Sequence, residues 1–353
     1  MSVTIDGNLG IDKVAPGGVE ASDLNMDIGS LSFRNKIING NFDIWQRSTS
    51  QTTSGYGSDD RYNNSHIGST KTNSRQEFTV GQTDVPGNPR YFSRTVVSSV
   101  AGAANYVLKG HAIENVKTFA GKTATLSFYA KADSTKNISI ELYQHFGTGG
   151  SPSKLVAGIG VNKIQLTTSW QRFEFTIQIP SITGKTIGTS GGDHLNVGFW
   201  FDAGSNYNAR TASLGQQSGT FDIAQVQLEE GSVATPFEDR PIGLELELCQ
   251  RYLFAITAKT SQHILGIGYN VSAEVARFYI NFPINMRIAP TSTLTGTIGT
   301  YDGAILAEAS SIYEYVSTDT VAQISIEVSV TQFHPAVFFI KTTGEKLVFQ
   351  AEL

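Results

Sequence analysis

Residues 221–252 read FDIAQVQLEEGSVATPFEDRPIGLELELCQRY, and this stretch decides the fold because it ends one β-rich unit and begins another. Phe221 and Ile223 alternate with polar neighbours, whereas Val226 and Leu228 continue the alternation one residue out of phase. One extra residue in a strand causes such a shift, since successive side chains point to opposite faces of a sheet. We therefore predict a bulged closing strand whose break lies between the two apolar pairs.

The residues that follow leave the sheet. Glu229–Gly231 add charge and a flexible residue, and Pro236 and Pro241 cannot donate ladder hydrogen bonds. Apolar positions 242, 246, 249 and 253 then fall at helical spacing, although the run LELEL would equally fit a strand. Because proline suits the first turn of a helix, we predict a short connecting helix within residues 239–254.

Regular alternation of apolar and polar residues recurs on both sides of this stretch. One dry face and one wet face are typical of antiparallel sheets packed face to face, so the pattern predicts an all-β protein. Gly-rich spacers separate the segments, and their number in the first unit favours a jelly-roll β-sandwich. The clearest segments are residues 126–131, 138–146, 172–179, 195–202, 276–282, 324–330 and 347–353.

These patterns divide the chain into four parts. Residues 1–34 are rich in Gly, Asp and Ala and show no sustained period, so we expect a segment that becomes ordered only on a partner. Residues 35–238 form the predicted jelly roll, and residues 239–254 form the connecting helix. Residues 255–353 form a second, smaller β-sandwich whose last strand runs to the final residue.

Composition and charge exclude several classes of function. The chain of 353 residues carries a net charge of −5 and has no long basic run, so we expect neither a nucleic acid nor an anionic membrane as partner. Its start lacks the basic and apolar regions of a signal peptide, and no apolar run is long enough for membrane insertion. The single cysteine, Cys249, excludes an internal disulfide framework and fits assembly in a reducing cytoplasm.

The run TPFEDRPIGLELELCQRY and the run INGNFDIWQR at residues 38–47 resemble a family of bacteriophage tail or fibre virion proteins. The resemblance continues through residues 130–153, 167–189 and 201–229, and it reaches FPINMRIAPT at residues 282–291. The family's sandwich is similar to carbohydrate-binding modules, and its members carry a second β-rich tail. The resemblance implies that residues 1–34 anchor the protein to other virion components, and that Asp60 and Arg61 form a structural ion pair.

Aromatic and polar side chains occupy the predicted wet faces of the jelly roll. A Trp or Tyr platform flanked by amides and carboxylates is what a glycan requires, because sugars present apolar C–H faces beside hydroxyl groups. A neighbouring subunit could bury the same face, since Tyr and Trp are also favoured at protein interfaces, and a loop of the same chain could cover it. The candidate residues for glycan binding or subunit contact are Tyr129, Glu141, Tyr143, His145, Asn196, Trp200 and Asp202.

A structural calcium ion is a further hypothesis, drawn from similar sugar-binding modules. The matching groups are Asn41, Asp43 and Asp222, which offer the hard oxygen ligands that calcium prefers. The same residue types are also common at turns and strand ends, and that explanation is favoured. No other cofactor is expected.

The sequence contains no sharp catalytic motif. It lacks a GxSxG elbow, a phosphate-binding loop and an HExxH motif, and its six histidines have no metal-ligand spacing. Pairs of carboxylates such as Glu141 and Asp202 could serve glycoside hydrolysis, but a sequence does not fix the separation that this chemistry needs. We therefore expect a protein that is not an enzyme.

Together the residues and the resemblance predict a virion structural protein of a phage tail, assembled in the host cytoplasm. We expect a homotrimeric fibre or appendage subunit that contacts other tail proteins through residues 1–34 and attaches to host surface polysaccharide. Avidity supports the trimer, since a threefold array multiplies weak glycan contacts. Two alternatives are a capsid decoration protein and, less favoured, a host polysaccharide depolymerase.

Overall fold

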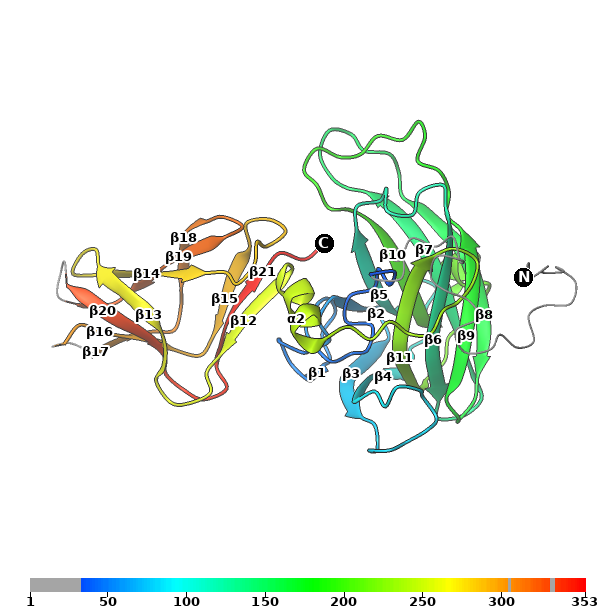
Figure 1. The fold of residues 1–353 in the computed structure, drawn as a ribbon, viewed down its shortest axis with the longest axis horizontal. Coiled ribbons are helices and arrows are strands. Elements are labelled where there is room, and N and C mark those ends of the chain that lie inside the picture. Colours follow the sequence, from blue (N-terminus) through cyan, green and yellow to red (C-terminus); the bar gives the residue numbers. More distant parts are fainter. Residues whose placement is uncertain (1–32, 304–305, 331–333) are drawn as a thin grey trace, which may run out of the picture.

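The computed structural model describes residues 33–303, 306–330 and 334–353 of the chain. The predicted anchor at residues 1–34 therefore lies almost entirely outside the described residues. Two β-rich domains lie side by side, with one helix between them (Figure 1). The fold is all-β, as the alternation predicts, and none of the helices in the described residues is long and apolar enough to cross a membrane.

The first domain is a sandwich of two antiparallel sheets. One sheet has six strands in the order β1 (Ser50–Gln51), β3 (Thr70–Glu77), β4 (Tyr91–Ser98), β11 (Gly219–Glu230), β6 (Thr123–Ala132) and β9 (Gln171–Gln178). The other has five strands in the order β2 (Tyr62–Ile67), β5 (Tyr106–Glu114), β10 (Asp193–Ala203), β7 (Lys136–Phe146) and β8 (Val156–Leu166). Strands distant in sequence are neighbours in both sheets, as in a jelly roll.

Apolar rows from both sheets meet in one core. Leu126 and Phe128 of β6 face Leu195, Val197 and Phe199 of β10, and all five side chains are buried. Burial of each such side chain contributes about 1.5–3 kcal/mol. The alternation that defines these strands therefore supplies the main favourable free energy of the sandwich.

The closing strand β11 contains the predicted bulge. Its pairing with β6 skips between Ala224 and Gln227, and Gln225 adopts a positive φ of 48°. Phe221 and Ile223, and after the bulged residue Val226 and Leu228, are all buried in the core. The extra residue therefore turns the later side chains of the strand back toward the core. The prediction of a bulge is confirmed.

The connecting helix α2 (Ile242–Gln250) begins directly after Pro241. Cys249 is fully buried on its inner side, as expected for a small apolar side chain. A shorter helical segment, η3 (Ser205–Tyr207) followed by α1 (Asn208–Thr211), leads out of β10. It lies beside β7 and β8 and becomes important for the site.

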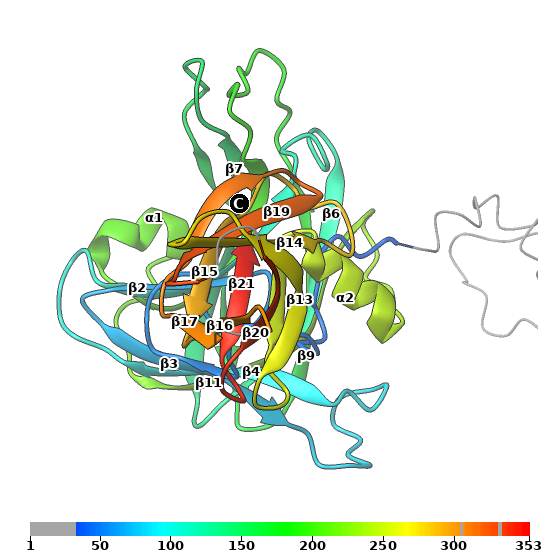
Figure 2. The same cartoon turned by 90° about the vertical axis from the view of Figure 1, so that its left-hand side faces the viewer.

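The second domain is the predicted smaller β-sandwich. Its three-stranded sheet has the order β12 (Leu253–Thr257), β21 (Lys346–Gln350) and β15 (Thr291–Thr295). Its seven-stranded sheet has the order β17 (Leu306–Ala309), β16 (Ile298–Tyr301), β20 (Pro335–Ile340), β13 (His263–Asn270), β14 (Val275–Asn281), β19 (Val321–Glu327) and β18 (Tyr313–Ser317). Figure 2 shows these strands from the end of this domain.

Ion pairs join the two domains. Glu352 binds Arg61, which is almost fully buried, and also Arg47 at 3.2 Å. Glu114 of β5 accepts hydrogen bonds from Arg251 at 2.8 Å and from the Tyr252 hydroxyl at 2.7 Å. The expected ion pair between neighbouring residues 60 and 61 is therefore wrong, because the arginine binds the second domain instead.

Candidate functional site

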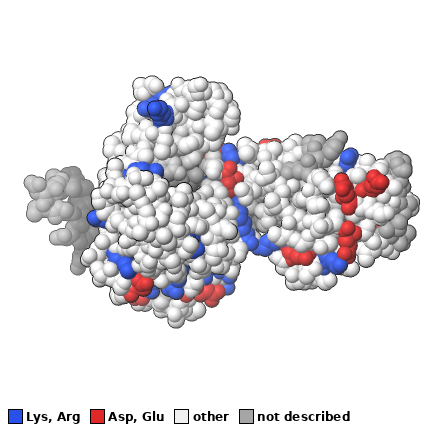
Figure 3. All heavy atoms as spheres, turned by 180° about the vertical axis from the view of Figure 1, so that it is seen from behind, with Lys and Arg blue, Asp and Glu red and all other residues white. Residues whose placement is uncertain are grey.

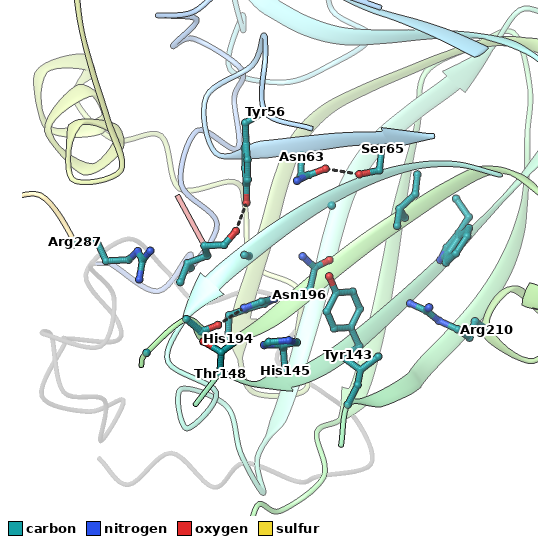
Figure 4. Close-up of a pocket in the computed structure, with 18 of the residues that line it drawn as sticks. Tyr56, Asn63, Ser65, Tyr143, His145, Thr148, His194, Asn196, Arg210 and Arg287 are labelled. Carbon is teal, nitrogen blue, oxygen red and sulfur yellow. Dashed lines mark hydrogen bonds between the residues drawn. The ribbon is translucent and has the colours of Figure 1, made fainter. Parts of the chain in front are cut away.

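A cleft of about 720 Å³ lies over the outer face of the five-stranded sheet (Figure 4). Its lining side chains come from alternate positions of four strands, and side chains at such positions share one face of a sheet. This face is opposite to the one that packs into the core. The strand residues that line it are Asn63, Ser65, Tyr106, Leu108, Gly110, Ala112, Tyr143, His145, His194, Asn196 and Trp200.

Two glycines produce the hollow at the centre of the sheet. Gly110 of β5 and Gly198 of β10 are directly paired, so two adjacent positions carry no side chain. A Cβ on Gly110 would lie 3.1 Å from the amide oxygen of Asn196, and a Cβ on Gly198 would lie 3.2 Å from Leu108. The side chains of Asn196 and Leu108 therefore lie close against the paired glycines, and of the two glycines Gly110 lines the cleft.

An aromatic cluster forms one wall. The rings of Trp200, Tyr106 and Tyr207 lie 5.0–5.6 Å apart, and Tyr207 is the last residue of η3. Trp200 is only 1% exposed because Tyr207 and Arg210 cover it. The half-buried tyrosines present the aromatic surface that a ligand would contact.

A buried carboxylate holds this wall in place. Glu141 is fully buried and accepts hydrogen bonds from Arg210 Nε at 3.0 Å and from Trp200 Nε1 at 3.1 Å. Arg210 also lies 5.1 Å from the Trp200 ring and 5.7 Å from the Tyr143 ring. Its guanidinium therefore connects β7, β10 and α1, and it contacts two of the aromatic residues, Trp200 and Tyr143.

Histidines and a tyrosine form the opposite part of the cleft. His145 and His194 stack with ring centroids 4.9 Å apart, and Tyr143 lies 5.9 Å from His194. Burial lowers the pKa of His194 to about 4, so this ring is neutral near pH 7. Burial also raises the pKa of Tyr143 to about 12, so its hydroxyl keeps its proton and can donate a hydrogen bond.

Asn196 provides an unsatisfied acceptor in the cleft. The residue is 5% exposed, and its side-chain oxygen has no hydrogen-bond partner in the described residues. A buried amide oxygen without a partner costs about 1–3 kcal/mol, so a bound hydroxyl that donates to it would recover this energy. Asn196 is thus a polar anchor beside Tyr143, its partner on β7 (Figure 4).

The second domain closes one end of the cleft. Arg287 and Ile288 from the loop after β14 line it, together with Leu353 and Tyr56. Arg287 is held by backbone carbonyls, through Nε to Ala351 at 2.8 Å and Nη2 to Glu352 at 2.6 Å. Tyr56 donates a hydrogen bond to the carbonyl of Leu353 at 3.3 Å. The cleft is therefore built by both domains.

The structure brings together only part of the predicted site. Tyr143, His145, Asn196 and Trp200 all line the cleft. Glu141, Trp200 and Asp202 are buried, so cover by other parts of the same chain, one of the alternatives for this face, applies to these three.

Asp202 and Tyr129 lie apart from this group. Asp202 accepts hydrogen bonds from Ser69, Ser99 and the Gln217 amide, because a register shift after Trp200 places it under the loops at the end of β10. Tyr129 belongs to the other sheet.

Several cleft residues were missed by the sequence argument. Tyr106 extends the alternation of β5 and could have been found from that pattern. Tyr207, Arg210 and Arg287 lie on short helical or loop segments, where period-two alternation gives no signal. Only the tertiary fold places them over the sheet.

The proposed calcium ligands do not form one group. Asn41 donates a hydrogen bond to Asp43 at 2.9 Å, whereas Asp222 binds Arg94 through both carboxylate oxygens at 2.7 and 2.8 Å. Burial and the nearby Asp239 and Glu245 raise the pKa of Asp43, although the hydrogen bond from Asn41 opposes this shift. Across the described ranges, no cluster of three or more His, Cys, Asp or Glu side chains could hold a metal ion.

Comparison with known proteins gives matches of structure only. No family model and no curated protein matches the chain. A family 11 carbohydrate-binding module from Clostridium thermocellum, solved with a mixed-linked tetrasaccharide, is 10% identical; the match covers 53% of this chain and 98% of that one, with a TM-score of 0.31.

Two further structures match at 12% identity with a TM-score of 0.32. The match to a putative sugar-binding protein from Bacteroides thetaiotaomicron covers 56% of this chain and 100% of that one. The match to the enzymatically active domain of tailspike protein 4 from bacteriophage CBA120 covers 56% of this chain and 22% of that one.

Proposed function

We propose that the protein binds a glycan in the cleft over the five-stranded sheet. The observation that carries the proposal is the combination of half-buried aromatic rings, an unsatisfied amide oxygen and a glycine in the lining of one concave site. Aromatic faces pack against the C–H surface of a sugar ring, while Asn196 and Tyr143 exchange hydrogen bonds with its hydroxyls.

The site supports binding rather than turnover. Glycoside hydrolysis requires two carboxyl groups about 5–9.5 Å apart and flanking the scissile bond. Of the described residues that line the cleft, none is Asp or Glu. Glu141 lies beneath the lining and is fully engaged by Arg210 and Trp200, so it stabilises the site rather than reaching a glycosidic oxygen.

In this proposal the protein is a structural and adhesive component of a phage tail. The support is the sequence resemblance at residues 38–47 and 235–252 to phage tail and fibre proteins. A tail appendage would display the cleft to host surface polysaccharide and would attach to other virion proteins through residues 1–34. Trimeric assembly belongs to the same proposal, and a capsid decoration protein would instead be found on the head by cryo-electron microscopy of the particle.

A glycan array of bacterial surface polysaccharides tests the binding. Tyr143→Ala removes a ring from the cleft, and Tyr129→Ala removes the same ring from the outer face of the other sheet. We expect Tyr143→Ala to weaken binding about tenfold, equivalent to about 1.4 kcal/mol, and Tyr129→Ala to leave it unchanged. Equal loss in both variants, or release of reducing ends by the wild-type protein, would contradict a binding site in this cleft.

A further inference from the structure

The side-chain charges at the cleft are unbalanced. Its lining contains Arg210 and Arg287 but, in the part of the chain that the structure describes, no Asp or Glu side chain. This is unexpected in a chain with a net charge of −5. The two arginines lie at opposite ends of the cleft in Figure 4.

Only one of these arginines is available to a ligand. The charge of Arg210 is compensated by Glu141, which accepts two hydrogen bonds from its guanidinium. Arg287 forms no salt bridge within the described residues, because its Nε and Nη2 donate to backbone carbonyls. Its Nη1 has no protein partner there and is not buried.

The surroundings of Arg287 add to the positive charge. Two Glu carboxylates that form ion pairs at the domain junction already bind arginines. Basic side chains gather where the two lobes meet in Figure 3. The junction arginines are Arg47, Arg61, Arg251 and Arg287, and the two carboxylates are those of Glu114 and Glu352.

We propose, building on the glycan-binding function above, that the cleft is selective for an acidic polysaccharide and that Arg287 of the second domain binds a sugar carboxylate. A guanidinium pre-positioned by backbone carbonyls recognises a carboxylate with little further loss of side-chain entropy. The aromatic wall then packs against the neighbouring sugar ring. The second domain therefore determines ligand selectivity as well as closing the cleft.

The test compares each surface polysaccharide of the array with its carboxyl-reduced form, in which the uronic acid becomes a neutral sugar. Wild-type protein should bind the native form at least about tenfold more tightly, and this preference should fall as NaCl rises because salt screens the pairing. Arg287→Gln should abolish the preference, and Arg287→Lys should retain part of it.

Arg172→Gln, on the other sheet, is the matched control and should leave both affinities unchanged. Thermal unfolding of each variant separates a binding defect from a folding defect. Equal binding of native and reduced forms by the wild-type protein would overturn the acidic selectivity but leave glycan binding intact. Binding to neither form of any polysaccharide would overturn both.

A separate observation concerns the outer face of the seven-stranded sheet. Leu306, Tyr301, Val337 and Ile267 lie opposite one another on four successive strands and form one apolar row. Further apolar side chains flank this row. The exposed members of the face are Ile264, Ile267, Tyr269, Tyr279, Tyr301, Leu306 and Tyr313, each 41–73% exposed.

The size of this face corresponds to a protein interface. With about 150–250 Å² for a full aromatic side chain and roughly half of each residue exposed, the seven residues present on the order of 700 Å². The largest apolar patch of a typical monomer is about 300–600 Å², and a stable interface buries about 800 Å² on each partner. Two charged side chains beside it have partners, since Arg277 donates a hydrogen bond to the Ser325 hydroxyl and Glu308 binds Lys341.

We infer that this face is covered by a second copy of the chain. The area is close to what a stable contact between copies buries, and aromatic and aliphatic side chains of this kind are typical of the interfaces between copies of one chain. Light scattering on the full-length protein, at concentrations on the order of 10 μM, should give a mass of at least two chains. Ile267→Asp should yield the monomer while preserving the circular dichroism spectrum.

Ile67→Asp is the matched control, since Ile67 is an exposed isoleucine of the first domain. It should leave the mass unchanged. A wild-type monomer, or an oligomer that survives Ile267→Asp, would overturn this assignment. Neither outcome depends on glycan binding.

Discussion

Replacing Arg210 with methionine tests whether a buried ion pair holds the cleft wall. Glu141 is fully buried, and it would keep only the hydrogen bonds from Trp200 Nε1 and from the Gly158 amide, each 3.1 Å long. Removing one partner of a buried pair typically costs 3–5 kcal/mol. Arg210 is 29% exposed, so water can reach the vacated position, and we expect the lower end, about 3 kcal/mol.

Urea unfolding followed by tryptophan fluorescence measures this loss, because Trp200 lies directly beside the pair. The double variant Glu141→Gln with Arg210→Met removes both charges and should be more stable than Arg210→Met alone. Comparison of the wild type, Arg210→Met, Glu141→Gln and the double variant should give a coupling energy of about 1–2 kcal/mol. Arg172→Met, which breaks an exposed pair with Glu174, should change the free energy of unfolding by less than about 0.5 kcal/mol.

Two results would refute the reasoning. If the free energy of unfolding of Arg210→Met lies within about 0.5 kcal/mol of the wild-type value, the burial of Glu141 does not depend on its ion pair with Arg210. If the coupling energy is near zero, the two side chains act independently. In either case the aromatic wall would need another explanation for its geometry.

Three further predictions concern the first domain. Lys109→Met should cost about 3–5 kcal/mol of unfolding free energy because it leaves the buried Asp59 unpaired, and adding Asp59→Asn should restore part of it in urea unfolding. Burial lowers the pKa of His194 from 6.5 to about 4, so the unfolded chain binds this proton more tightly than the folded chain. Lowering the pH from 6.5 to 4 should therefore reduce the free energy of unfolding by up to about 3 kcal/mol. His194→Asn should reduce the difference between the free energies of unfolding measured at pH 7 and pH 4.5. Burial raises the pKa of Asp60, so this carboxyl stabilises the folded state at low pH, and it does so equally in both proteins. Gly110→Val should add bulk to the cleft lining and reduce glycan affinity about tenfold or more by calorimetry, with the fold retained, since the three atoms nearest its Cβ all belong to the side chain of Asn196.

Local pattern was sufficient for the sandwich. The two apolar pairs of β11 lie out of phase in the sequence, and the strand bulges between them because every inward position must remain dry. Likewise Pro241 and the helical spacing after it predict α2, whose start the structure places at Ile242. Such features depend on neighbours within a few residues, so one sequence contains them.

Period-two alternation also identified the outer face of the five-stranded sheet, but not what covers it. Trp200 lies on that face and is buried, because Tyr207 and Arg210 fold back over it from a segment without strand periodicity. Tyr129 has the same local pattern as Tyr143 but belongs to the other sheet.

The sequence by itself thus determined which side chains point inward and which outward, since that depends on the backbone period alone. The tertiary structure decided which outward faces become a cleft and which charges remain uncompensated there. Arg287 joins residues of β7 and β10 that lie far from it in the chain, and only the packing of the second domain against the first brings them together.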